Sequence, residues 1–359
     1  MRLKMRKRID KKHHFISTFD ETTGFYARSG IILSGKETNS DPFMSSFPEL
    51  LDVGIMGHCE HGLTGLCRKS GVQCYQSGGV RKQPDMSLED FVRILKECHQ
   101  DTYQIALGGR GDPDMHEDFE EILAACRQYH VVPNFTTSGY GMTKEKAVLC
   151  KKYCGAVAVS WYGSSYTLQA IKLLLDAGVK TNIHYVLSRN SIDKAVELIA
   201  ADSFPAGINA VIFLLHKPVG LGSEENVLRI DDPRVAQFFQ LIDSGRISFK
   251  IGFDSCSIPG LLHFCSSLAE ESLDTCEGAR WSAYITPDMK MLPCSFDNEA
   301  QRWAVDLNTH TIQQAWDSPE FENFRNTFRN ACPTCAKREE CRGGCPIAPQ
   351  IVLCTKDGY

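Results

Sequence analysis

The sequence lacks three features that would tie it to a membrane, a secretory route or a nucleic acid. No apolar run approaches the roughly 18 residues that a membrane-spanning helix needs, and the N-terminus has no apolar segment of the signal-peptide type. A large excess of positive charge is also missing, since the formal net charge is −5. These absences argue against a general nucleic-acid binder and predict a cytoplasmic protein without a membrane or nucleic-acid partner.

Cysteine, by contrast, is abundant, with 16 residues in a chain of 359. Cytoplasmic thiols stay reduced, so clustered cysteines indicate metal ligands rather than disulfides. Cys59, Cys67 and Cys74 lie in one Gly-rich stretch, with spacings of seven and six residues. Three thiolates can hold a [4Fe–4S] cluster and leave one iron open to a substrate or cofactor. A zinc site completed by His58 or His61 is the alternative.

From residue 50 to residue 253 the sequence alternates short β-rich runs with amphipathic helical segments. Such repeats predict a parallel sheet with right-handed crossovers, and six units suit a partial (β/α)6 barrel. The predicted strands are 50–56, 103–109, 131–139, 156–163, 180–188, 208–216 and 247–253. The clearest predicted helices are 88–100, 119–129, 168–178 and 192–202. Four further cysteines in the helical segments, at 98, 126, 150 and 154, are expected to be buried and inert.

Polar or glycine residues follow most of these strands. Gly108 and Gly109 end the second strand, with Arg110 and Asp112 just beyond, and the fourth strand ends at Ser160. Ligands of parallel barrels bind at the carboxyl ends of the strands. The sequence therefore predicts a polar site there, beside the three-cysteine stretch.

A three-cysteine loop after the first strand, a Gly-Gly turn after the second and a (β/α) alternation resemble the radical S-adenosylmethionine (SAM) enzymes. The family's loop has spacings of three and two, and its usual acidic residue after Gly-Gly is replaced here by Arg110. The resemblance implies that Cys59, Cys67 and Cys74 hold the cluster that cleaves SAM. It further implies that SAM binds at a set of strand-end residues. These are Gly108, Gly109, Asp112, Ser160 and Arg189.

Seven cysteines near the C-terminus resemble the SPASM domain, which carries two auxiliary [4Fe–4S] clusters. The likeness includes the hairpin sequence ITPDMKMLPC, where Met289 replaces the usual glycine, and it places this domain at 254–359. It implies three [4Fe–4S] clusters in all. One auxiliary cluster would use Cys332, Cys335, Cys341 and Cys354; the other would use Cys276, Cys294 and Cys345, with a fourth ligand absent or supplied by Cys265 or Cys256. Paired zinc ribbons would fit the same spacings.

This resemblance implies a radical SAM maturase of ribosomally made peptides. In that chemistry a 5′-deoxyadenosyl radical takes hydrogen from the precursor. The wide cysteine loop and the segment TGFYARSGI are similar to the spliceases that excise tyramine and leave an α-keto-β-amino acid. Thioether or carbon–carbon crosslinking and formylglycine formation in a sulfatase are alternatives, and an iron–sulfur electron carrier is the non-enzymatic one.

The sequence of the N-terminal region, residues 1–49, predicts a basic arm followed by a segment that leads into the barrel. Its first 14 residues carry seven Lys or Arg against one Asp. Because 58 residues precede Cys59, the region is too short for the leader-binding module of many relatives. We therefore expect a separate small leader-binding protein, with Arg2–Lys12 as one contact, and a flavodoxin or ferredoxin as electron donor.

Overall fold

A ten-stranded sheet runs through the whole molecule. The computed structural model describes residues 5–38, 40–245, 247–269 and 273–355. The strand order is β12-β11-β10-β9-β8-β7-β6-β13-β14-β15, in which β6 to β12 are parallel. The parallel strands are β6 (Leu50–Met56), β7 (Gln104–Gly109), β8 (Val132–Thr137), β9 (Val157–Ser160), β10 (Thr181–Leu187), β11 (Ala210–Leu215) and β12 (Ile251–Phe253). The predicted partial (β/α)6 barrel is confirmed.

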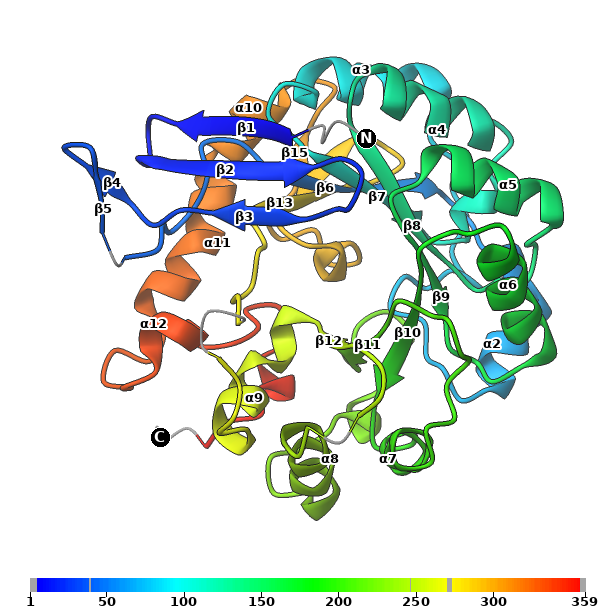
Figure 1. The fold of residues 1–359 in the computed structure, drawn as a ribbon. Helices are drawn as coiled ribbons and strands as arrows, with labels where there is room; N and C mark the ends of the chain where they lie inside the picture. The colour runs from blue at the N-terminus through cyan, green and yellow to red at the C-terminus, as the bar shows by residue number, and fades with distance from the viewer. Residues whose placement is uncertain (1–4, 39, 246, 270–272, 356–359) are drawn as a thin grey trace.

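Six helices cover the convex side of the curved sheet (Figure 1). They are α3 (Leu88–Cys98), α4 (Phe119–Gln128), α5 (Lys144–Tyr153), α6 (Ser165–Asp176), α7 (Ile192–Ala200) and α8 (Pro233–Asp243). Side-chain oxygens of Ser87, Thr143 and Ser164 accept the first backbone N–H groups of α3, α5 and α6, which fixes where these helices begin. In the described ranges we find no helix with the length and apolar character that crossing a membrane requires.

Strand residues alternate between the helix layer and the barrel lumen. In β6, Leu51, Val53 and Ile55 are fully buried beneath the helices, whereas Asp52 and Gly54 face inward. The same period of two recurs in β7 and β10. This alternation lets one strand contribute both to the core and to a site inside the barrel.

The N-terminal residues form a second, three-stranded sheet rather than a free arm. Its strands are β1 (Met5–Asp10), β2 (Phe15–Asp20) and β3 (Tyr26–Arg28), and a small hairpin of β4 (Ile32–Leu33) and β5 (Lys36–Glu37) follows. Arg6 donates to the carbonyls of His99, Thr102 and His130. Arg8 pairs with Glu49 and Asp101. The basic N-terminal sequence therefore forms a strand, and the arginine side chains of this strand bind it to the barrel.

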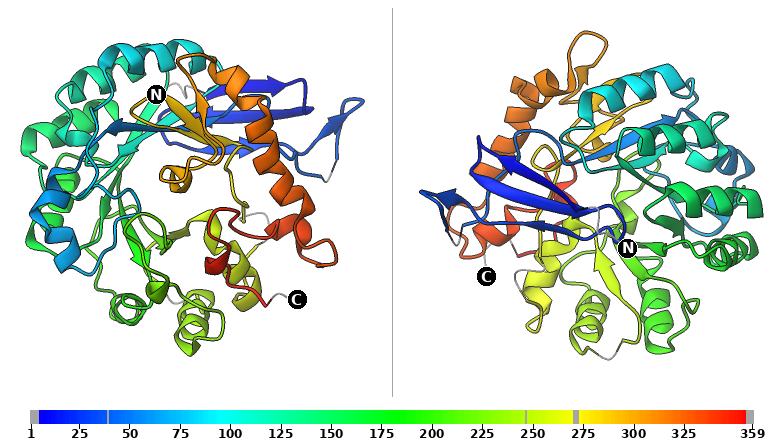
Figure 2. Two further views of the ribbon diagram at one scale, coloured as in Figure 1. Left: turned by 180° about the vertical axis from the view of Figure 1, so that it is seen from behind. Right: turned by 45° about the horizontal axis from the view of Figure 1, so that its top comes forward.

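The C-terminal region extends the barrel sheet instead of standing apart from it. Strand β13 (Ser282–Ile285) pairs in parallel with β6, and β14 (Lys290–Leu292) and β15 (Val305–Asp306) follow in antiparallel order. The helices α10 (Ile312–Trp316) and α11 (Pro319–Asn330) run beside the N-terminal sheet (Figure 2), and α12 (Arg338–Cys341) follows them. The sheet is thus continuous across the boundary predicted at residue 254.

Met289, in the β13–β14 turn, is held in the left-handed region at φ 60° although its side chain is only 3% exposed. We predict that Met289→Gly destabilises the protein by about 1–4 kcal/mol. Relief of left-handed strain returns about 1 kcal/mol, whereas loss of a buried methionine costs about 2–5 kcal/mol. The measurement is the urea midpoint of unfolding.

The matched control is His130→Gly, at φ 59° on an exposed residue just after α4. This change removes the same strain without emptying a core position, so the midpoint should rise by the equivalent of about 1 kcal/mol of stability. A higher midpoint for Met289→Gly than for the parent would contradict the prediction.

Candidate active site

The three-cysteine loop follows β6 and is built from two short helices. Cys59 caps α1 (Glu60–Thr64), and its Sγ accepts the Gly62 N–H at 3.0 Å. Cys67 lies in α2 (Leu66–Lys69), which starts after Gly65 at φ 70°. Cys74 follows, and its Sγ accepts the Gly78 N–H at 3.5 Å. The helical turns account for the wide cysteine spacing.

Close backbone contacts fix this loop to the end of β7. A Cβ on Gly111 would lie 2.2 Å from the His58 carbonyl oxygen, and one on Gly78 would lie 2.3 Å from the Arg110 carbonyl oxygen. Neither position has room for a side chain. The cysteine loop therefore sits directly on the carboxyl ends of β6 and β7, as the sequence predicted.

The three thiols lie close enough to interact electrostatically. Burial raises the pKa of the Cys59 thiol to about 12, with smaller contributions from Asp112, Cys74 and Cys67. In the described residues no three His, Cys, Asp or Glu side chains converge on a point where they could hold a single metal ion. A [4Fe–4S] cluster differs in that each thiolate binds a different iron, and the iron charge would keep these buried sulfurs ionised. The donor set fits such a cluster.

Both histidines considered as zinc ligands have other partners. His58 Nδ1 lies 3.2 Å from Asp85 and its Nε2 lies 3.2 Å from Glu60. The buried His61 ring hydrogen-bonds Tyr166 through Nε2 at 2.8 Å, and the rings of Tyr140 and Tyr162 enclose it. This aromatic cluster was not predicted, because its members lie in four different loops or helices.

Gly108 and Gly109 differ in what surrounds them. A Cβ on Gly108 would meet no atom within 4 Å, so the space beside it is open. Gly109 has φ 113°, and a Cβ there would lie 2.4 Å from the Met56 carbonyl oxygen. Gly109 is thus required by the packing of β7 on β6, and Gly108 is the residue that leaves room for a ligand.

Asp112 and Ser160 lie at the carboxyl ends of β7 and β9, and Arg189 lies on the loop after β10. Asp112 accepts the Ser138 N–H at 2.7 Å, and burial raises the pKa of its carboxyl group to about 6. Ser160 ends β9 beside His184 of β10. Arg189 is exposed, its backbone N–H donates to Asn226, and in the described part of the chain no contact links its side chain to the cysteine loop.

The barrel lumen is hollow because many of its inward positions carry small residues. Gly54, Ala106, Gly108, Ala158 and Gly252 face inward, whereas closed (β/α) barrels fill these layers with branched side chains. A cavity of about 250 Å³ occupies the end of the lumen away from the cysteine loop. The small side chains leave space for part of a substrate.

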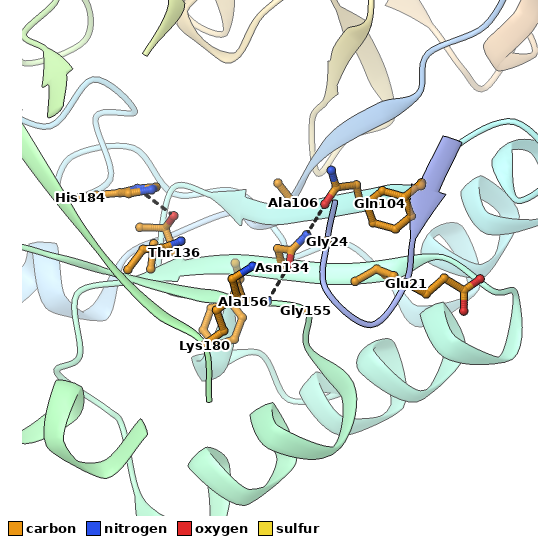
Figure 3. Close-up of a pocket in the computed structure, with 15 residues that line it drawn as sticks. Glu21, Gly24, Gln104, Ala106, Asn134, Thr136, Gly155, Ala156, Lys180 and His184 are labelled. Carbon is orange, nitrogen blue, oxygen red and sulfur yellow. Dashed lines mark hydrogen bonds between the residues drawn. The ribbon is translucent and has the colours of Figure 1, made fainter. Parts of the chain in front are cut away.

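Amide and imidazole groups line that cavity, as Figure 3 shows. Asn134 donates to Gln104 at 2.9 Å and accepts the Ala156 N–H, while Thr136 and His184 are joined at 3.3 Å. The β2–β3 loop, held by the Lys180 ammonium through the Thr23 carbonyl at 2.8 Å, borders the cavity. These side chains offer both hydrogen-bond donors and acceptors to a guest.

The C-terminal cysteines form two groups. The outer cysteine group is Cys332, Cys335, Cys341 and Cys354, in which Cys341 interacts electrostatically with the other three. The inner cysteine group is Cys256, Cys276, Cys294 and Cys345. The Cys256 and Cys345 side chains are hydrogen-bonded to each other, and this contact raises the pKa of Cys256.

Cys265, the other residue considered for the inner group, lies elsewhere. It follows α9 (Ile258–Phe264), and its Sγ donates to the Phe239 carbonyl of α8 at 3.7 Å. Burial raises the pKa of this thiol to about 12, and Asp243 is its charged neighbour. The structure thus gathers Cys256, and not Cys265, with Cys276, Cys294 and Cys345.

Side chains beyond Cys294 contact the cysteine loop directly. The rings of Tyr75 and Phe296 lie 4.5 Å apart, and Asn298 donates to Gln76 at 2.6 Å. Arg110 pairs with Glu299 at 2.9 Å, which explains a basic residue where the resembled family has an acidic one. The three-cysteine loop and the segment that follows Cys294 of the inner cysteine group are therefore in direct contact.

Three buried polar groups around this contact have no hydrogen-bond partner within the described ranges. They are Tyr284 OH, Gln76 Nε2 and Arg110 Nε. Buried polar groups of this kind are normally satisfied by a ligand or an ordered water molecule. Their position beside the open space at Gly108 fits a polar cofactor at the carboxyl ends of the strands.

Comparisons with known proteins match this geometry. The SPASM model, an iron-sulfur cluster-binding domain, matches residues 276–343. The mycofactocin maturase MftC of Mycobacterium ulcerans is 25% identical over 82% of this chain and 84% of its own length. Streptococcus suis SuiB bound to its precursor peptide SuiA superposes with a TM-score of 0.69 at 13% identity, covering 98% of both chains. The fold and the C-terminal domain agree with these proteins, and the chain is a radical SAM enzyme with a C-terminal SPASM domain.

Proposed function

We propose that the protein is a maturase that modifies a ribosomally made precursor peptide by radical SAM chemistry. The observation that carries the proposal is a three-thiol loop at the carboxyl ends of β6 and β7, on a barrel whose lumen holds an amide-lined cavity at its other end. The similarity to a protein named mycofactocin maturase and to a structure with a bound precursor peptide supports it. A peptide backbone presents both N–H and C=O groups, which the amide and imidazole side chains of the lumen complement.

Three [4Fe–4S] clusters complete the proposal. The loop thiols Cys59, Cys67 and Cys74 would hold the first, and the inner and outer cysteine groups would hold the two auxiliary clusters. When bound, the loop cluster and SAM supply the 5′-deoxyadenosyl radical that takes a hydrogen atom from the precursor. Four thiols in the inner group leave no iron there without a protein ligand.

We assign SAM to the carboxyl ends of β7 to β10. Gly108 leaves the space, Asp112 and Ser160 face it with acceptor oxygens, and Gly109 holds the turn. Arg189, on the exposed loop after β10, is the outermost member of the predicted set. The aromatic cluster around His61 keeps water from the side of the loop that faces α6.

The first reaction to test is backbone splicing with tyramine excision. The wide cysteine loop, built from α1 and α2, is the feature that supports this choice. Crosslinking of precursor side chains is the second candidate. The observation that favours it is a relative named PqqA peptide cyclase from Streptomyces rochei, 21% identical over 74% of this chain and 77% of its own.

A separate leader-binding protein and a flavodoxin or ferredoxin are the partners we propose. In the described part of Arg2–Lys12, Arg6, Arg8 and Lys12 bond within the chain, so Lys7 and Lys11 are the exposed cations of that segment left for an acidic partner. At physiological salt the electrostatic attraction of two exposed lysines is largely screened beyond about 8 Å. The electrostatic contact would thus be local rather than long-range.

Reduced, reconstituted protein should cleave SAM to 5′-deoxyadenosine and modify a co-expressed precursor. Mass spectrometry of the precursor distinguishes the reactions, because splicing removes a tyramine unit whereas a crosslink removes two hydrogens. An electron carrier would leave SAM intact. Absence of SAM cleavage by protein with full iron content would refute the proposed function.

Iron content tests the assignment of the cysteines. The parent should hold close to three clusters, and replacing Cys59, Cys67 and Cys74 together by Ala should remove one. Cys256→Ala should weaken or remove the inner cluster, because one of its four thiols is lost. Cys265→Ala is the matched control and should keep the parent iron content and EPR spectrum. Loss of the inner cluster from Cys265→Ala, with the parent iron content kept by Cys256→Ala, would exclude Cys256 as the ligand.

Filling the lumen should block the precursor. Ala158→Leu adds three carbons to an inward position of β9 beside the cavity. We expect precursor modification to fall at least tenfold while iron content and circular dichroism stay at parent values. Ala200→Leu, on the exposed end of α7, is the control. Full modification by Ala158→Leu would place the peptide outside the lumen.

A further inference from the structure

Lys217 is a buried cation that the proposed chemistry does not use. It follows β11, and only 3% of the residue is exposed. Its Nζ lies 2.6 Å from Asp254 Oδ2, 2.9 Å from the Leu215 carbonyl oxygen and 4.4 Å from the centre of the Phe296 ring. An ammonium group has three donors, and these three partners occupy them. Lys217 is therefore a fixed charge rather than a proton donor.

Both side-chain partners of Lys217 stand next to cysteines of the inner group. Asp254 lies just before the 3-10 turn Ser255–Ser257, which contains Cys256. Phe296 lies two residues after Cys294. Lys217 also lies close enough to Cys256 and Cys345 to interact with both electrostatically. The lysine is thus built into the wall of the inner cysteine group.

Stability alone does not explain this charge. Burying an ion pair costs several kcal/mol per ion in desolvation, and apolar residues of similar volume are often as stabilising. Asp254 has partners besides the lysine, since its Oδ2 accepts the Leu215 N–H at 3.2 Å and its Oδ1 accepts the Ser257 hydroxyl at 2.7 Å. The segment that carries Cys256 is therefore fixed by more than the ion pair.

We propose that the fixed charge of Lys217 raises the reduction potential of the cluster held by the inner cysteine group. The inference rests on the proposed function, which places a [4Fe–4S] cluster at these four thiols. Reduction adds a negative charge to a cluster already carrying thiolates, and a nearby fixed cation stabilises the reduced form more than the oxidised form. A raised potential suits a cluster that accepts the electron left on the product.

The test is a redox titration followed by EPR on the reconstituted full chain. The Cys59/Cys67/Cys74→Ala background removes the loop cluster, so only auxiliary signals remain. In that background Lys217→Met, of similar length without charge, should make reduction of the inner cluster about tenfold less favourable, a shift of ~59 mV for one electron. The outer cluster should keep its midpoint.

Lys217→Arg retains the charge and should retain the parent midpoint. Lys146→Met is the matched control, since Lys146 also pairs with a buried carboxylate, Asp114, at 3.4 Å. It should leave both auxiliary midpoints unchanged. Lys217→Gln, which keeps a donor for Asp254, is the second neutral variant.

The inference would be overturned if Lys217→Met or Lys217→Gln kept the inner cluster and its reduction midpoint did not change. Loss of that cluster from both neutral variants would overturn it too, because the lysine would then form the site rather than set its potential. Failure of the proposed function is seen separately, as a parent protein whose iron content or EPR spectrum lacks the inner cluster.

Discussion

The pairing of β13 with β6 is the constraint on which the rest of the site depends. Backbone hydrogen bonds join the C-terminal region to β6, the first strand of the barrel, with Tyr284 beside Asp52 in register. Because the cysteine loop starts at the end of β6, this one pairing fixes the distance between that loop and the segment after Cys294. The contact of Tyr75 with Phe296 and the Arg110–Glu299 ion pair follow from it.

Because β13 pairs with β6, residues of both the barrel and the C-terminal region line the lumen. Desolvation raises the pKa of Asp52 to about 6 and that of Glu277 to about 7, and the two carboxyl groups interact. One comes from β6 and the other from the segment that leads into β13. A substrate in the lumen would therefore contact residues from both sides of the predicted domain boundary.

Small residues make this arrangement possible. Gly109, Gly111 and Gly78 allow main chain to meet main chain around the cysteine loop, where any Cβ would collide. Gly108 instead leaves space open, since a Cβ there would meet no atom within 4 Å. Gly54 makes room for Tyr284, because a Cβ on Gly54 would lie 2.4 Å from the Tyr284 hydroxyl oxygen. Glycine thus has two roles here, close packing of the loop and room for the reactants.

The sequence by itself determined the barrel and the ligand types. Periodicity located β6 at residues 50–56 and the barrel helices within a few residues, because inward and outward faces repeat locally. Cysteine spacing indicated a three-thiol loop, and the resemblance to the SPASM domain implied two further groups. Only the tertiary structure decided that the basic N-terminus is a strand, since Arg6 and Arg8 find their partners about 40 to 125 residues away. It likewise decided that Cys256 rather than Cys265 joins Cys345 and that Lys217 lies beside them. These contacts join segments that are distant in sequence. No local sequence pattern specifies whether Cys256 or Cys265 lies beside the other thiols in the folded chain.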